Sequence, residues 1–388
     1  MIGRTAAPLW DLSREQPALA APGDRVQFSA VRELIEVTDT QAGAADSEVP
    51  ATQEPDVQSG LLILSPGLQS LIQDLGRPGH AGLGVSSAGA LDRSSLRRAN
   101  RIVGNDPSAA VVESVAGGLR VQAVGDQVLA VAGAPSALTV VTPSDVPDPD
   151  APEDDGDQPE SDRSDRVREV PMATAFALLD GEILTIGAPE LGFRSYLAIR
   201  GGAAIDAVLG SRSTDTMSGI GPAPLAAGQL LGAGAATSSN VVGNPELQPD
   251  FPDTGVTVLE IVPGPRDDWF DAAALESLCA QDWAVTPRSN RVGMRLDGQA
   301  LSRSRDGELP SEGTMAGALQ IPPEGQPVLF LADHPITGGY PVIGVVVDHQ
   351  LDLAAQVPIG GSIRFRWAPG YGLPTSFSES SPNISQTK

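Results

Sequence analysis

Residues 333–341 (DHPITGGYP) put an acid, an imidazole, a hydroxyl and a phenol around one turn. An aspartate can act as a general base, and a phenol or hydroxyl can donate a hydrogen bond to a carbonyl whose oxygen gains charge. Two adjacent glycines let the backbone turn tightly or approach another group closely. The candidate catalytic residues are therefore Asp333, Thr337 and Tyr340, and Gly338 and Gly339 are candidate substrate-binding residues.

Apolar runs at residues 328–331 and 342–347 flank this segment, so the local pattern predicts strand, sharp turn, strand. A Gly-Gly hairpin without any function gives the same pattern. Both interpretations of the turn stay open on the sequence alone.

Arginines close to glycines and hydroxyls are candidate anion holders, because a guanidinium can bind a carboxylate or phosphate with two hydrogen bonds. Such patterns occur at residues 73–79 (QDLGRPG), 210–214 (GSRST) and 289–298 (SNRVGMRLDG). A pair between Asp74 and Arg77 that merely ties down a loop is an equally simple interpretation. Asn100, Asn105 and Glu113 are expected to cap a helix and its exit. The candidate substrate-binding residues are Asp74, Arg77, Arg212, Ser213, Arg291, Arg295, Glu312 and Gln320, with His349 and Gln356 as second choices.

Several kinds of catalytic site are excluded by composition. Lys388 is the only lysine, so the folded body has no Schiff-base lysine, phosphate-loop lysine or biotinylated lysine. The three histidines lack metal-ligand spacing, so no metal site is expected. The single cysteine, Cys279, is expected to be a core thiol; it excludes an internal disulfide framework and fits a cytoplasmic location.

The net charge of −24 argues against nucleic acid and anionic membranes as partners. No stretch approaches the ~20 apolar residues of a membrane span. Much of the acid lies in residues 143–169, which are almost free of apolar side chains. We therefore expect this segment to be a disordered insertion in a loop.

The chain is expected to be mainly β, because it has 43 glycines, 34 prolines and only 4% aromatic residues among its 388 residues. A helix is predicted over residues 93–103, with Asp92 as N-cap and Gly104 as the stop, and another over residues 267–280. The expected organisation is an N-terminal segment (1–36), a linker (37–59), a first body (60–240), a second body (255–368) and a disordered tail (369–388).

Five long sequence blocks follow one another in a characteristic order. They are residues 68–106, 193–214, 289–298, 311–327 (SEGTMAGALQIPPEGQP) and 353–365 (LAAQVPIGGSIRF), with the turn at 333–341 between the last two. Together they resemble the KipA family, the C subunit of the prokaryotic 5-oxoprolinase, which is related to the carboxyltransferase domain of urea carboxylase. The resemblance covers roughly residues 60–367. Many relatives carry Arg-Gln-Thr where this chain has His334, Pro335 and Ile336.

The resemblance implies two tandem cyclophilin-like β-barrel domains with a few short helices. It also implies a role in the ATP-dependent opening of 5-oxo-L-proline to L-glutamate, together with subunits A and B, with ATP and Mg in the complex and no covalent biotin on this chain. One alternative is a carboxyltransferase component that acts on urea or a related amide with separate biotin partners. Another is a regulatory protein without turnover that binds a kinase inhibitor.

The N-terminal segment resembles a different family. Pro-Leu-Trp-Asp (8–11) is followed by Gly-Asp-Arg-Val-Gln-Phe (23–28), the order found at the C-terminal end of the KipI family, the B subunit of the same enzyme. Val26, Phe28 and Val31 alternate as in a strand. We therefore interpret residues 1–36 as the end of a KipI-like B subunit, joined by a polar linker to the KipA-like region.

Truncation before Ser59 is expected to leave the rest of the chain folded, because the N-terminal segment belongs to neither body in this interpretation. Thermal unfolding of the truncated and full-length chains checks it. An unfolded truncated chain would mean that the segment is part of the first body.

Overall fold

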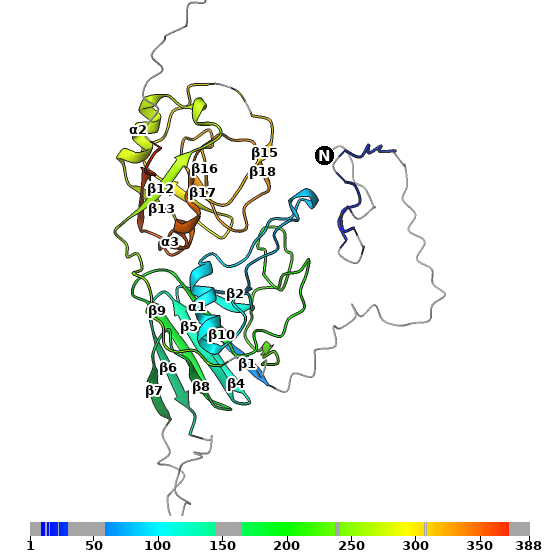
Figure 1. Cartoon of the computed structure of the whole chain (residues 1–388), viewed down its shortest axis with the longest axis vertical. Coiled ribbons are helices and arrows are strands. Elements are labelled where there is room, and N and C mark those ends of the chain that lie inside the picture. The colour runs from blue at the N-terminus through cyan, green and yellow to red at the C-terminus, as the bar shows by residue number, and fades with distance from the viewer. Residues whose placement is uncertain are drawn as a thin grey trace, which may run out of the picture.

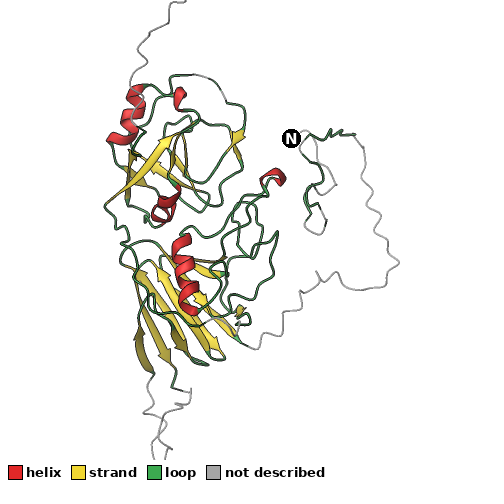
Figure 2. Cartoon of the chain, viewed as in Figure 1, coloured by secondary structure: helices red, strands yellow, loops and turns green. Residues whose placement is uncertain are grey.

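A computed structural model of the chain describes residues 59–144, 165–236, 241–305, 307 and 309–371, together with residues 9–11, 14, 16–21 and 23–29. Two bodies follow one another along the chain, the first mostly cyan and green and the second yellow to red (Figure 1). Strands make up most of both bodies, and the helices are few and short (Figure 2). The predicted mainly-β fold class is confirmed.

The first body encloses its core between two antiparallel sheets. The six-stranded sheet has the order β11 (Leu230–Gly232), β1 (Gly60–Pro66), β4 (Leu119–Val124), β9 (Ile183–Pro189), β6 (Ser136–Thr142), β7 (Arg166–Val170). The five-stranded sheet has the order β2 (Gln69–Gln73), β3 (Val111–Val115), β10 (Arg194–Ile199), β5 (Gln127–Gly133), β8 (Phe176–Leu178). Leu61 and Val121 of the first sheet pack with Val131 and Leu197 of the second. In the described part of this body no strand pairing joins the two sheets, so it differs from the closed barrel expected here.

The second body is a closed barrel, as expected. Its strand order is β12 (Val256–Pro263), β19 (Val342–Val346), β16 (Ala318–Gln320), β17 (Val328–Phe330), β14 (Gly293–Asp297), β13 (Trp283–Val285), β20 (Ser362–Trp367). Strand β20 closes the ring by pairing in parallel with β12. Leu259, Trp283 and Phe365 are at most 1% exposed and lie in its core.

Helix α1 (Arg93–Val103) has the predicted ends. The Asp92 carboxylate accepts a hydrogen bond from the Ser95 amide at 2.9 Å, and Gly104 ends the helix in the left-handed region with φ of 73°. Leu96 and Ala99 are fully buried in a cluster shared with β5 and β10. The helix therefore covers the outer side of the five-stranded sheet.

The predicted helix over residues 267–280 is wrong in its first turn. A 3-10 turn, η3 (Asp267–Trp269), comes first, and helix α2 (Ala272–Ala280) begins only after Asp271, whose carboxylate accepts from the Ala274 amide at 2.8 Å. Cys279 in α2 packs against the barrel core, and burial raises the pKa of its thiol to about 11. The other short helices are η1 (Ala81–Leu83), η4 (Asp348–Gln350) and α3 (Leu351–Ala355).

The segment at residues 333–341 is not a hairpin turn. Strands β17 and β19 do not pair with each other; each pairs with β16, which lies between them. The connection between them forms a short strand, β18 (Thr337–Gly338), that pairs with β15 (Glu312–Gly313). The hairpin interpretation is therefore wrong, because a third strand occupies the position that a hairpin partner would take.

The acidic segment predicted to be disordered over residues 143–169 contains a strand at its end. Backbone pairing joins β7 to β6 from Thr142↔Arg166 to Leu138↔Val170. Val170 is 9% exposed and packs in the core, and Arg168 pairs with Glu182 at 2.8 Å. Residues 145–164 lie outside the described residues. The sequence prediction failed for β7 because an edge strand needs backbone partners more than apolar side chains.

The described residues of the N-terminal segment join neither body. They form one isolated bridge, Trp10↔Ala18, and Val26 and Phe28 are 60% and 79% exposed. Val31 lies outside the described residues. No helix in the described part of the chain is long and apolar enough to cross a membrane.

Deletion of residues 146–163 is expected to change the free energy of unfolding by less than about 1 kcal/mol, because loop closure depends only weakly on loop length. Extending the deletion through Val170 removes β7 and should cost about 2 kcal/mol or more, since a core side chain and a row of backbone hydrogen bonds are lost. Denaturant unfolding of both variants measures the difference. Equal losses in the two variants would contradict the structural role given to β7.

Candidate active site

A buried arginine joins the two bodies. The side chain of Arg291, from the second body, is 2% exposed. Its Nε and Nη2 donate to the two carboxylate oxygens of Asp333 at 3.1 and 3.0 Å. Its Nη1 donates to Glu113 on β3 of the first body, and its Nη2 also donates to the carbonyl of Gly89. Arg291, expected to bind substrate, thus uses its donors within the protein and connects β3 to the turn at residues 333–341.

The charges in this network stabilise one another. Burial alone would lower the pKa of Arg291, but the carboxylates of Glu113 and Asp333 outweigh burial and raise it above its ordinary value. Burial alone would raise the pKa of Glu113, and the charges of Arg291 and Arg194 outweigh burial and lower it. The arginine and Glu113 are therefore charged at neutral pH although both are buried.

A second group of polar side chains surrounds Glu113. The Tyr196 hydroxyl donates to Glu113 at 2.9 Å and accepts from the Asp92 amide at 2.8 Å. Gln356 of the second body donates to the Asp92 carboxylate at 2.7 Å and accepts from the Arg194 amide at 2.8 Å. These directional hydrogen bonds therefore constrain how the two bodies are oriented, in addition to the pairing of their charges.

The N-terminus of α1 also binds the second body. The amides of Arg93 and Ser94 donate to the Asp352 carboxylate at 2.9 and 3.1 Å, which places a negative charge at the positive end of the helix. Burial and the nearby charge of Asp92 raise the pKa of Asp352. This contact fixes α1 relative to α3.

Asp333, the candidate base, is completely buried. Besides Arg291, its Oδ2 accepts from the amide and the hydroxyl of Thr216 at 2.9 and 2.7 Å. Action as a base would require one of these bonds to open. In the structure Asp333 fixes the start of the turn against both bodies, and its catalytic role stays a prediction.

The loop at residues 73–79 is organised by Asp74. Its carboxylate accepts from the hydroxyls of Ser211 and Ser213, both at 2.6 Å, and from the amides of Gly76 and Arg212 at 2.8 and 2.6 Å. Among the described residues no salt bridge joins it to Arg77, so the paired-loop interpretation is not what the structure has. Asp74 instead anchors residues 211–213.

Arg77 is 1% exposed, and one of its guanidinium nitrogens has no hydrogen-bond partner among the described residues. Its Nε donates to the carbonyl of Val208 at 3.3 Å, and its Nη2 donates to the carbonyl of Ser213. Its Nη1 is buried and has no hydrogen-bond partner among the described residues. Burial lowers the pKa of Arg77, and Asp215, Asp74 and Asp333 counteract that effect. A buried donor without a partner is what an anionic oxygen or a bound water would satisfy.

Residues 213–218 join this loop to Asp333. Asp215 accepts from the hydroxyls of Ser86 and Ser218 at 2.9 and 2.6 Å, and the next residue, Thr216, binds Asp333. Asp74, Arg77, Ser213, Asp333 and Arg291 therefore belong to one continuous polar network.

The rest of the turn lies at the surface of the second body. Gln320 donates to the carbonyl of Tyr340 at 3.1 Å. A Cβ on Gly338 would lie 2.5 Å from Nε2 of Gln320, so any larger residue there would have to displace the end of that glutamine. Thr337 is exposed, and Tyr340 is 46% exposed with Arg303 5.8 Å from its ring centroid. The Tyr340 hydroxyl has no partner among the described residues and is free to bind a ligand.

Three of the predicted residues lie apart from this network or are otherwise engaged. Glu312 forms an ion pair with Arg266. The Nε of Arg266 donates to the Glu312 carboxylate at 3.0 Å, and this hydrogen bond lowers the pKa of Glu312. Arg295 is exposed on β14, where its neighbours Met294 and Leu296 point into the barrel. The side chain of Arg212 extends toward a separate pocket.

Sequence reasoning missed Glu113 and Thr216 as members of the network. Glu113 was expected only to support the helix and its exit. A signal was present, since a single carboxylate within the buried strand VVESV needs a cationic partner. Nothing in the sequence around Thr216 indicates its contact with Asp333.

The chain thus consists of two β-rich bodies with a polar network between them, and its sequence matches a family of two-subdomain carboxyltransferases. Residues 83–367 match the model of the carboxyltransferase domain, subdomain A and B, and the chain belongs to this family. The C subunit of 5-oxoprolinase from Escherichia coli (strain K12) is 34% identical over 313 residues, which cover 79% of this chain and 90% of that protein. The corresponding 5-oxoprolinase C subunit from Haemophilus influenzae is 29% identical over 305 residues, or 78% of this chain and 89% of that protein.

Other relatives are longer than this chain. The urea amidolyase of Saccharomyces cerevisiae is 29% identical over 324 residues, which cover 78% of this chain but 16% of that protein. The urea amidolyase structure from K. lactis matches with a TM-score of 0.68 and 26% identity over 80% of this chain and 19% of that chain. The crystal structure of TTHA0988 matches with a TM-score of 0.73 and 31% identity over 92% of this chain, and this chain spans 64% of its length.

Replacement of Arg291 by Met is expected to lower the free energy of unfolding by about 3–5 kcal/mol at pH 7, because Glu113 and Asp333 would be left buried without their cation. Arg295→Met, on the exposed face of β14, is the matched control and should change stability by less than about 0.5 kcal/mol.

The stability difference between the wild type and the Arg291→Met variant should depend on pH. The folded pKa of Glu113 is lowered, so its stabilisation is present above its unfolded pKa and is lost as the pH falls through the folded value. Without Arg291 burial would raise that pKa, so the gap between variant and wild type should start to narrow above the ordinary glutamate pKa of about 4.3 and go on narrowing as the pH falls below it. Denaturant unfolding at several pH values measures the gap. A constant gap would contradict the ionic role of Arg291.

Proposed function

We propose that this chain is the C subunit of an ATP-dependent 5-oxoprolinase and helps convert 5-oxo-L-proline to L-glutamate together with separate subunits A and B. The observation that carries the proposal is the extent of the match. The similarity to the E. coli protein covers 90% of its length, whereas the similarity to the yeast urea amidolyase covers 16% of a much longer one. The lone cysteine supports a cytoplasmic location.

The reaction needs donors that this site can supply. A lactam is stabilised by resonance, and phosphorylation of its oxygen makes the carbonyl carbon electrophilic, so that water can attack it. Such chemistry requires a cation for the substrate carboxylate and donors where negative charge develops. ATP and Mg belong, in this proposal, to the assembled complex. The described residues of this chain include no group of three metal-ligating side chains, so no step here is assigned to Mg.

Two side chains are suited to bind the substrate, one at the exposed turn and one in the buried network. The free hydroxyl of Tyr340 can donate to the lactam carbonyl, and Thr337 of the same turn is also exposed. The unpaired Nη1 of Arg77 can donate to an anionic oxygen. Gln320 and Asp333 are positioning residues, because they fix the two ends of the turn that carries Tyr340.

Carboxyl transfer to urea or a related amide is the second candidate, and the urea amidolyase relatives favour it. That reaction would need separate biotin partners, because the folded body has no lysine to carry biotin. A regulatory role without turnover is the third candidate, and it requires binding without product formation.

The decisive experiment is co-expression of this chain with subunits A and B. We expect glutamate release that requires 5-oxo-L-proline, ATP and all three proteins, and none from this chain alone. Omission of each protein in turn is the control. Release by the purified chain alone would overturn the shared-site proposal, and biotin-dependent carboxylation of urea without glutamate release would favour the second candidate.

Tyr340→Phe in the assembled complex is expected to lower turnover at least tenfold, about 1.4 kcal/mol of barrier, with an unchanged melting temperature. Tyr371→Phe is the matched control, because Tyr371 is similarly exposed, at 51%. Asp333→Asn should lower both stability and turnover, since that carboxylate is buried against Arg291. Normal turnover in Tyr340→Phe would remove the phenol from the proposed chemistry.

A further inference from the structure

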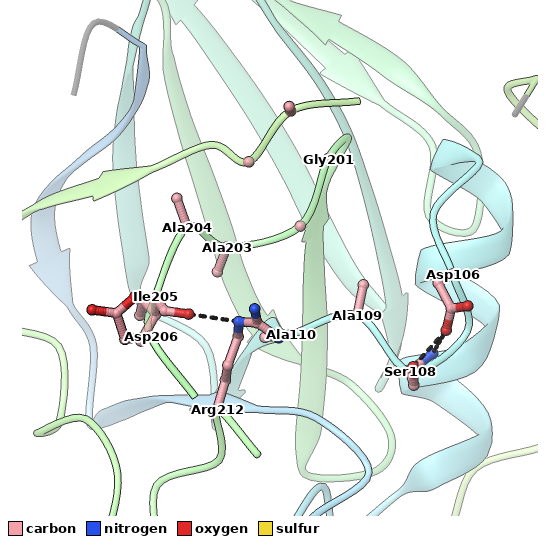
Figure 3. Close-up of a pocket in the computed structure, with 13 residues that line it drawn as sticks. Asp106, Ser108, Ala109, Ala110, Gly201, Ala203, Ala204, Ile205, Asp206 and Arg212 are labelled. Atoms are coloured by element: carbon pink, nitrogen blue, oxygen red, sulfur yellow. Dashed lines mark hydrogen bonds between the residues drawn. The ribbon is translucent and has the colours of Figure 1, made fainter. Parts of the chain in front are cut away.

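A pocket of about 570 Å³ lies in the first body, outside the network described above. It is formed by the loop after α1, the turn that follows β10, the segment after β11 and Arg212 (Figure 3). Pockets of this volume are typical of small-molecule sites. None of the functions considered above uses it.

The wall of the pocket is built from the smallest residues for a geometric reason. A Cβ on Gly201 would lie 1.9 Å from the carbonyl oxygen of Gly234, and a Cβ on Gly234 would lie 2.4 Å from that of Gly201. The Ala203↔Ala233 bridge continues the same pairing. Ala110 and Ala203 are 3% and 7% exposed and form its inner, apolar surface.

A single cation points into this space. The backbone amide of Arg212 is fixed by Asp74 at 2.6 Å, and its Nε donates to the carbonyl of Ile205 at 2.5 Å. Figure 3 shows the guanidinium between Ile205 and Ala110, and Arg212 is among the residues that line the pocket. Its two Nη groups have no partner among the described residues. The Asp74 anchor thus holds an arginine with both terminal nitrogens available.

We propose that this pocket binds a small organic monocarboxylate. The two Nη groups of Arg212 would hold the carboxylate, and the apolar body of the ligand would lie against Ala110 and Ala203. Two hydrogen bonds from one planar guanidinium match the two oxygens of a carboxylate.

The charges around the pocket disfavour a dianion. Asp106 and Asp206 also line it, so that its lining carries two carboxylates and one guanidinium. Asp106 accepts from the amide of Ser108 at 2.8 Å and from its hydroxyl, and it stays at the rim beside that turn. Phosphate carries more negative charge than a monocarboxylate at neutral pH, so these acids repel it more strongly.

The test uses the full-length chain with uniform ¹⁵N labelling and two probes, propionate and inorganic phosphate, at pH 7.5. We expect propionate to shift the amide signals of the glycines that line the pocket, with saturation below about 50 mM, and phosphate to bind at least threefold more weakly. Arg212→Gln should weaken propionate binding at least tenfold, about 1.4 kcal/mol.

Matched variants separate the pocket from general effects of charge and shape. Ala204→Leu fills the exposed side of the pocket and should also weaken binding tenfold, whereas Ala207→Leu, nearby and outside the lining, should not. Arg295→Gln removes an exposed arginine elsewhere and should leave binding unchanged. The proposal is overturned by unsaturated shifts, by phosphate binding as tightly as propionate, or by equal weakening in Arg295→Gln. Ala204→Leu keeps the test decisive if Arg212→Gln lowers the melting temperature.

Discussion

The structure depends on one buried cation between two carboxylates. Arg291 brings its charge from the second body to Glu113 of the first, and the same guanidinium holds Asp333 at the start of the turn. Burying three charges is costly unless each is paired and hydrogen-bonded, and here the partners come from different bodies. The two bodies therefore fit together through paired charges and directional hydrogen bonds as well as through shape.

This arrangement links the position of the turn to the docking of the bodies. Thr216 of the first body binds Asp333, Gln320 of the second body holds Tyr340, and the exposed phenol lies at the end of that chain of contacts. A small shift of one body against the other would be transmitted to Tyr340.

Local sequence patterns predicted local structure well. The ends of α1 followed from Asp92 and Gly104. The partner of Arg291 could not be predicted, because Glu113 is 178 residues away and their contact exists only when the bodies dock. The hairpin prediction failed for a related reason, since β16 enters between β17 and β19 from elsewhere in the chain.

Closure of the second barrel by parallel pairing of β12 with β20 has a consequence for biosynthesis. The first and last strands of this body are neighbours in the ring, so the ring cannot close before Trp367 has left the ribosome. Until then β12 exposes an unpaired edge, and such long-range pairing forms slowly. The first body, complete much earlier in synthesis, would meanwhile hold Glu113 and Arg194 ready for residues that have yet to be made.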